Sequence, residues 1–163
     1  ACIGISRLGR IMVYRFSYET VLGVVTFVEE GGALLAVTTH RSYEGVEQET
    51  ALIKEAYQQL SEYLKGERKE FDLPLNPKGT DFQKRVWRAL CNIPYGETRS
   101  YKQIAEAIGN SKAVRAVGMA NNRNPITIVV PCHRVTGADG KLVGYGGGLE
   151  MKEFLLRLEK SLP

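Results

Sequence analysis

The chain has 163 residues, of which 44% are apolar and 25% are charged, and its net charge is +4. This is the length of one domain or two small ones and an ordinary globular composition, which argues against disorder, collagen and coiled coil. No apolar run approaches the ~18 residues of a membrane span, and no secretory signal is visible around Arg7, Arg10 and Arg15. Three cysteines in no disulfide or zinc-finger spacing indicate a reducing compartment, so we expect a cytoplasmic protein, nuclear if the source is eukaryotic.

The positive charge is concentrated in the second half of the chain. Residues 1–79 hold 9 basic and 11 acidic residues, whereas residues 80–163 hold 13 and 7. A basic excess attracts polyanions, and the alternative is a solvated surface that happens to be basic. We therefore look for a nucleic-acid partner in the second half.

Residues 1–72 are predicted to form a small N-terminal α/β domain. Short runs of β-branched, aliphatic and aromatic residues predict strands at Ile11–Phe16, Leu22–Val28 and Ala33–Thr38. Gly31-Gly32 between the last two is typical of a hairpin turn.

A helix is predicted after these strands, followed by a linker. Apolar residues at three- and four-residue spacing indicate a helix over Gln48–Lys65, which Gly66 ends. Residues 73–79 contain two prolines and have no helical period, so they are read as a linker. The only soft metal ligands before it are Cys2 and His40, too few for a tetrahedral zinc site, and we expect no metal.

Residues 80–163 are predicted to form a mostly helical domain. Capping boxes at Thr80–Gln83 and Ser100–Gln103 each begin a helix, and Gly109 ends the second. Ser111 is expected to cap a third helix, from Lys112 to about Asn122. Two short helices joined by a glycine-containing turn fit a helix-turn-helix.

The third helix carries small residues on one face, at Ala113, Ala116 and Ala120. Such a face admits close approach to a ligand backbone, and a tight contact between helices is the alternative. The β-branched run Ile126–Val130 predicts a buried strand. A glycine-rich loop over 142–148 precedes a last amphipathic helix from Leu149 to about Leu162, whose apolar face is expected to hold Met151, Phe154, Leu155 and Leu158.

Cys132 is the candidate nucleophile. A thiol of pKa about 8.5 is only a few per cent thiolate at neutral pH, and a nearby base or cation raises that fraction. His133 supplies a base and Arg134 positive potential, whereas the alternative is a core cysteine beside a satisfied histidine. Cys91, at the end of the first helix of this half, is interpreted as core packing.

The run Pro131-Cys132-His133-Arg134-Val135 is the signature of the O6-alkylguanine-DNA alkyltransferases, which residues 80–163 resemble. Ser100-Tyr101, the run 112–118, Asn124-Pro125 and Gly144-Tyr145 coincide with the family pattern in the same order. The resemblance implies an α+β fold: a ribonuclease-H-like N-terminal domain and, over 80–163, a winged helix-turn-helix domain that accepts the alkyl group.

The resemblance also implies a function and its residues. The protein would flip O6-alkylguanine out of duplex DNA and transfer the alkyl group irreversibly to Cys132, once per chain and without a cofactor. His133 would act as a water-mediated base oriented by Glu159, Tyr101 would donate to the guanine, and Asn124 would brace the bend before the active segment.

Binding residues are carried over in the same way. DNA would be contacted through its minor groove, by a monomer and without membrane association, at Arg115, Ala116, Ala113, Tyr101 and Asn122. The guanine pocket would be lined by Val135, Tyr145 and Gly146. Many relatives have serine where this chain has Gly146, which implies a roomier or more mobile pocket loop.

Two other function classes compete with this one. A DNA-binding regulator would use the helix-turn-helix alone, with Cys132 as an alkylation or redox sensor, and would strongly prefer one DNA sequence. A thiol hydrolase would use the same Cys-His pair and would turn over. Stoichiometric methylation of the chain distinguishes the repair protein from both.

Overall fold

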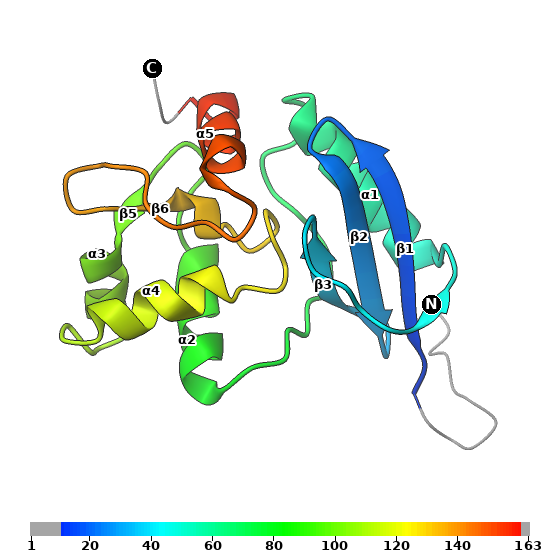
Figure 1. The fold of residues 1–163 in the computed structure, drawn as a ribbon, viewed down its shortest axis with the longest axis horizontal. Helices are drawn as coiled ribbons and strands as arrows, with labels where there is room; N and C mark the ends of the chain where they lie inside the picture. Colours follow the sequence, from blue (N-terminus) through cyan, green and yellow to red (C-terminus); the bar gives the residue numbers. More distant parts are fainter. Residues whose placement is uncertain (1–10, 161–163) are drawn as a thin grey trace. The chain divides into compact units, whose positions relative to one another are not determined.

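The computed structural model describes residues 11–160, which divide into two compact units between Pro77 and Lys78 (Figure 1). The expectations that concern Cys2, Arg7 and Arg10 lie outside the described residues. Among residues 11–160, no helix has the length and apolar character needed to cross a membrane.

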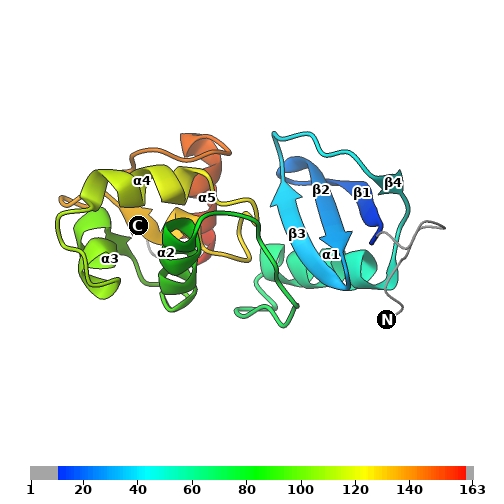
Figure 2. The same ribbon diagram turned by 90° about the horizontal axis from the view of Figure 1, so that it is seen from below.

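The first unit is a four-stranded sheet with one helix on a face (Figures 1 and 2). Its elements are β1 (Val13–Thr20), β2 (Gly23–Glu30), β3 (Ala33–Thr38), β4 (Val46–Glu47) and α1 (Ala51–Leu64). The strand order is β3-β2-β1-β4, antiparallel except that β4 runs parallel to β1. Phe27 and Leu60 are fully buried between sheet and helix, whereas Val28 packs with Tyr43 on the other face.

The three predicted strands are confirmed: the third has the predicted bounds, Ala33–Thr38, and the first two have shifted bounds. Gly31 and Gly32 have φ of +63° and +80°, the left-handed conformation that a two-residue hairpin turn requires. The first two strands begin later than predicted and end later, because their ladder continues through polar residues to Thr20 in β1 and Glu30 in β2. The helix begins later than predicted, since Thr50 caps it by accepting a hydrogen bond from the Ile53 N–H.

The second unit is mostly helical. Its elements are α2 (Asp81–Cys91), β5 (Arg99–Ser100), α3 (Tyr101–Ala107), α4 (Val114–Asn122), the 3-10 turn η1 (Cys132–Arg134), β6 (Val135–Thr136) and α5 (Leu149–Leu158). Both capping boxes are confirmed: the Thr80 and Ser100 hydroxyls accept from the third helical N–H, and Gln83 and Gln103 accept from the cap N–H. The prediction for Ser111 is wrong, because α4 begins at Val114 after Ala113, with no side-chain cap.

Helix α4 is fixed to α2 through its inner face. The Trp87 indole donates to the Ala120 carbonyl at 2.9 Å, and Val117 is fully buried. Ala120 is therefore a packing residue, whereas Ala116 is exposed and Ala113 half-buried. The small residues do not share one open face, because Ala116 is exposed, Ala113 is partly covered and Ala120 is in the core.

The predicted strand at Ile126–Val130 is wrong, although the segment is largely buried. It curls on itself: the Val130 N–H donates to the Ile126 carbonyl at 3.0 Å. Asn124 accepts from the Ile126 N–H at 3.0 Å and donates to the Val130 carbonyl at 2.9 Å, which replaces the bonds of a sheet ladder. Ile128 has φ of +73°, a strained conformation for a β-branched residue that the surrounding structure must hold.

Helix α5 buries a different face from the one predicted. Phe154 is 41% exposed, whereas Lys152, Leu155, Leu156 and Glu159 are buried at i, i+3, i+4 and i+7 spacing. Two of these four residues are charged, so hydrophobicity alone selects the wrong stripe.

Candidate active site

Backbone pairing brings two distant segments together around Cys132. β5 and β6 are parallel partners, with Arg99 opposite Val135 and Ser100 opposite Thr136. Tyr101 opens α3 directly after β5, and η1 directly precedes β6. The start of the first helix of the helix-turn-helix is therefore held beside the nucleophile segment.

Cys132 begins η1 and is only 5% exposed. Burial raises the pKa of its thiol, because the thiolate loses hydration. Hydrogen bonding from Asn124 and Tyr145 and the positive charge of Lys152 oppose this rise in pKa. The sulfur therefore needs a proton acceptor and stabilisation of its negative charge before it can attack.

His133 and Glu159 form the proton-accepting pair. His133 Nε2 lies 2.7 Å from Glu159 Oε2, and both side chains are completely buried. Because a carboxylate accepts, Nε2 carries the hydrogen and the neutral ring presents Nδ1 as a base. Nδ1 is buried and no atom of residues 11–160 bonds it. Burial lowers the pKa of His133 despite Glu159, so the ring is neutral and able to accept a proton.

Arg134 does not face Cys132 as predicted, because it is committed to Glu159. Its Nε donates to Oε1 at 2.8 Å and its Nη2 to Oε2 at 3.0 Å, while Nη1 donates to the Ile93 carbonyl at 2.7 Å. The carboxylate of Glu159 thus neutralises the guanidinium and at the same time orients His133. The positive charge that the sequence analysis directed at Cys132 is therefore compensated by Glu159.

Tyr101 and Lys152 both donate a hydrogen bond to the same loop carbonyl, that of Val143. The Tyr101 hydroxyl donates to the Val143 carbonyl at 2.9 Å, and Lys152 Nζ donates to that carbonyl at 2.9 Å and to the Gly144 carbonyl at 3.3 Å. Sequence reasoning missed Lys152. The signal for it was the spacing with Glu159, which puts both charges on the buried face of α5.

Two asparagines hold the backbone around the nucleophile. Asn124 accepts from the Ile126 N–H and donates to the Val130 carbonyl. Asn121, which the sequence did not single out, is 1% exposed, and its Nδ2 donates to the Cys132 carbonyl at 3.3 Å. Asn121 therefore links the C-terminal end of α4 to η1.

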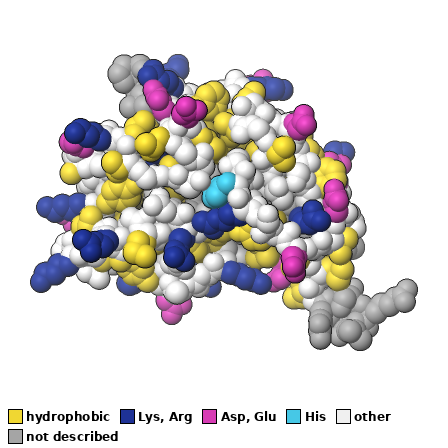
Figure 3. Space-filling view, in the orientation of Figure 1, with side chains coloured by type: hydrophobic (Ala, Val, Ile, Leu, Met, Phe, Trp, Pro, Cys, Tyr) yellow, Lys and Arg dark blue, Asp and Glu magenta, His cyan; other side chains and the backbone are white. Residues whose placement is uncertain are grey.

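The residues predicted to contact DNA differ in their exposure to solvent. Arg115, Ala116 and Asn122 are exposed on α4, Ala113 is half-buried at its start, and Tyr101 is half-buried. Figure 3 shows Lys and Arg side chains gathered over the side that carries α3 and α4, in the lower left of the view, with few acidic ones. The exposed basic residues there are Lys102, Lys112, Arg115 and Arg123.

The predicted pocket residues are divided between core and loop. Val135 is fully buried in β6, Tyr145 is half-buried and Gly146 is exposed. Cys91 is exposed at the end of α2, so its interpretation as core packing is wrong. Among residues 11–160, no three His, Cys, Asp or Glu side chains gather as a metal site would need.

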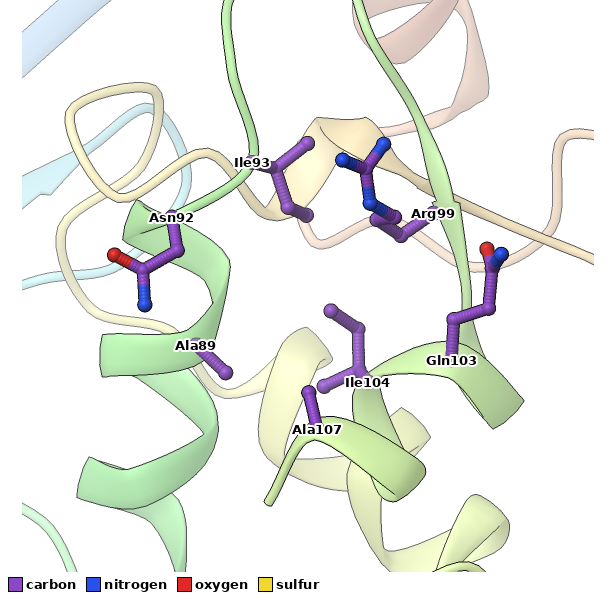
Figure 4. Close-up of a pocket in the computed structure, with 7 residues that line it drawn as sticks. All are labelled: Ala89, Asn92, Ile93, Arg99, Gln103, Ile104 and Ala107. Atoms are coloured by element: carbon purple, nitrogen blue, oxygen red, sulfur yellow. The ribbon is translucent and has the colours of Figure 1, made fainter.

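A hollow between α2 and α3 contains none of the predicted site residues (Figure 4). Two of its polar side chains are already engaged: Arg99 pairs with Glu97 at 3.1 Å, and Gln103 accepts from the Ser100 N–H at 2.8 Å. Ala89, Ile93, Ile104 and Ala107 form its apolar walls. The residues that line the hollow include no cysteine, serine or histidine, so Cys132 remains the candidate nucleophile.

Comparison with known proteins matches both units to one family. Residues 81–161 match the model of the 6-O-methylguanine DNA methyltransferase DNA-binding domain, and residues 6–77 match the ribonuclease-like domain of the same family. A methylated-DNA–protein-cysteine methyltransferase of Methanosarcina acetivorans is 50% identical over 155 residues, covering 91% of this chain and 99% of its own. Its counterpart in Mycobacterium tuberculosis is 48% identical over 155 residues, covering 92% and 94%.

Solved structures agree with the sequence comparison. The crystal structure of Mycobacterium tuberculosis O6-methylguanine methyltransferase superposes with a TM-score of 0.84 at 49% identity, covering 92% of this chain and 94% of that one. The crystal structure of the Mycobacterium tuberculosis protein OGT in complex with DNA gives a TM-score of 0.86 at 48% identity, covering 91% and 93%.

Proposed function

Since the chain belongs to the 6-O-methylguanine DNA methyltransferase family, we propose that Cys132 accepts an alkyl group from O6 of guanine in DNA, once per chain. The protein is a DNA repair methyltransferase that binds DNA. The observation that carries the assignment of Cys132 is a buried thiol followed by a histidine that a buried carboxylate orients.

The transfer is one displacement at carbon. The thiol proton passes through one water to Nδ1 of His133, and the sulfur attacks the alkyl carbon. A sulfur–carbon bond forms, the carbon–O6 bond breaks, and its electron pair returns to the guanine. Glu159 stabilises the imidazolium by accepting from Nε2, as the buried carboxylate does in thiol and serine hydrolases. The product thioether resists water, so the chain is consumed.

Tyr101 donates a proton or a hydrogen bond to the leaving guanine. Its hydroxyl lies at the start of α3 and donates to the Val143 carbonyl in the structure. Burial raises the pKa of Tyr101, so the phenol keeps its proton until a stronger acceptor arrives. The anionic guanine is such an acceptor. Val135, Tyr145 and Gly146 line the pocket that holds it.

The buried position of Cys132 requires the nucleotide to leave the duplex. Cys132 is only 5% exposed, and O6 of a stacked guanine cannot reach its sulfur. Extrusion costs a few kcal/mol, because the nucleotide loses its stacking and base pairing. A monomer places α4 in the minor groove, where Ala113 and Ala116 admit the sugar–phosphate backbone and Arg115 enters the stack in place of the extruded nucleotide.

The test is the intact mass of the chain after incubation with duplex DNA that contains O6-methylguanine. One methyl group per chain, with no turnover, is expected. Cys132→Ser should gain none while it binds the duplex as tightly as before, because the sulfur makes no phosphate contact. Cys91→Ser is the matched control and should react like the wild type, since Cys91 is exposed on α2. Methylation of Cys132→Ser would refute the assignment.

A further inference from the structure

Asn121 carries a buried side-chain oxygen that the described part of the chain does not satisfy. The residue lies in the last turn of α4 and is 1% exposed. Its Nδ2 donates to the Cys132 carbonyl at 3.3 Å, whereas no atom of residues 11–160 bonds its Oδ1. An unpaired acceptor in the interior is unfavourable, so this oxygen requires an explanation.

The bond to Cys132 fixes the direction in which the amide of Asn121 faces. A main-chain carbonyl only accepts, so the amide atom 3.3 Å from it is the nitrogen. Oδ1 belongs to the same planar amide and is therefore held beside η1, which begins at Cys132. The helix that carries Asn121 is fixed in turn, because the Trp87 indole donates to the Ala120 carbonyl at 2.9 Å.

A second unpaired acceptor lies in the same segment. His133 follows Cys132, and its Nδ1 is buried without a bonding partner among residues 11–160, while Glu159 fixes the ring through Nε2 at 2.7 Å. Asn121 Oδ1 and His133 Nδ1 both accept, so they cannot bond each other, and a group that donates twice satisfies both. Water has two hydrogens, and a buried water typically bonds about three polar groups that otherwise lack partners.

We propose that Asn121 is a further positioning residue of the transfer, whose Oδ1 holds the water that carries the thiol proton to His133. The water directs one hydrogen at Nδ1 and the other at Oδ1, which leaves a lone pair for the thiol hydrogen of Cys132. As it accepts that proton it releases its own to Nδ1, and the bond to Oδ1 persists. The products are a thiolate, an imidazolium and the same water. The proposal rests on the proposed function, which requires a water between thiol and imidazole.

The other polar groups around the thiol have different tasks. Asn124 uses its Oδ1 to accept a main-chain N–H at 3.0 Å, and Glu159 accepts from the imidazole and from a guanidinium. Tyr145 donates to the sulfur itself, and the ammonium of Lys152 has no acceptor to offer. Asn121 is therefore the side chain that can accept the second hydrogen of the water.

The test is a double-mutant cycle on the carboxamidomethylation of Cys132 by iodoacetamide at pH 7, followed by peptide mass spectrometry. Asn121→Leu fills the site but removes the acceptor, and should slow the reaction about ten-fold, the size of one hydrogen bond to a developing charge. His133→Gln removes the base. In that background Asn121→Leu should change the rate by less than about two-fold, since the water then has no imidazole to serve. Asn92→Leu, at an exposed position after α2, is the matched control and should react like the wild type.

Equal slowing by Asn121→Leu in both backgrounds would overturn the proposal, because a residue that only holds the backbone of Cys132 acts whether or not His133 is present. An undiminished rate in Asn121→Leu would overturn it too. Iodoacetamide contains no guanine, so this result is separate from the intact-mass test of alkyl transfer from DNA. A crystal structure of the wild-type protein covers the case in which Asn121→Leu does not fold. One water should lie within hydrogen-bond distance of Nδ1, Oδ1 and the sulfur, and an Oδ1 bonded to anything else, or to nothing, would refute the proposal.

Discussion

Glu159→Gln is expected to damage both stability and transfer, because one carboxylate serves two partners. It accepts from His133 at 2.7 Å and from Arg134 at 2.8 and 3.0 Å, and the Glu159 side chain is completely buried. Glutamine keeps the shape but removes the charge and puts an NH₂ group against one donor. The guanidinium of Arg134, a residue that is 7% exposed, is then buried without a counter-charge, which costs about 3–5 kcal/mol of unfolding free energy.

The same substitution should slow methyl transfer by about 10² or more, because the imidazolium loses its stabilising charge and Nδ1 its fixed orientation. Urea unfolding followed by circular dichroism gives the stability, and the single-turnover rate on methylated duplex gives the chemistry. Glu153→Gln is the control: its ion pair with Arg157 at 2.8 Å is on the surface, so its loss should cost no more than about 0.5 kcal/mol. If both variants unfold alike, the buried cluster is not what holds α5 in place.

Arg115→Ala should react with free O6-methylguanine at the wild-type rate but with methylated duplex one or more orders of magnitude more slowly, measured at saturating protein, because only the duplex requires extrusion. Equal slowing on both substrates would assign Arg115 to the pocket or the fold. DNA affinity should fall with salt at a log–log slope of roughly −4 to −5, from four to six phosphate contacts, and vary little with sequence. A flat salt response would contradict binding by the basic second unit. In a His40→Gln background, unfolding free energy should decrease as pH falls below about 6.5, because unfolded His133 takes up a proton that the folded state excludes. Urea titrations at pH 7.5 and 5.5 that coincide would show that His133 is protonated in the fold.

Local signals in the sequence predicted much of this fold. The capping boxes at Thr80 and Ser100 and the hairpin at Gly31-Gly32 form as expected, since each depends on residues only a few positions apart. The strand prediction at Ile126–Val130 failed for the opposite reason. β-branched residues indicate burial, but Asn124 supplies the hydrogen bonds that decide the backbone path.

The motif around Cys132 was enough to predict the family and to single out Cys132 and the adjacent histidine as candidate site residues. Only the tertiary structure decided how the charges are used. Arg134 stands two residues from Cys132, yet its partner is Glu159, 25 positions away, and the cation that acts on the thiol is Lys152. Charge partners are set by which faces of distant elements are buried together, because the strength of an ion pair depends on separation and local dielectric. Sequence spacing shows that Lys152 and Glu159 share a face of α5, but only packing against η1 and the glycine loop makes that face part of the active site.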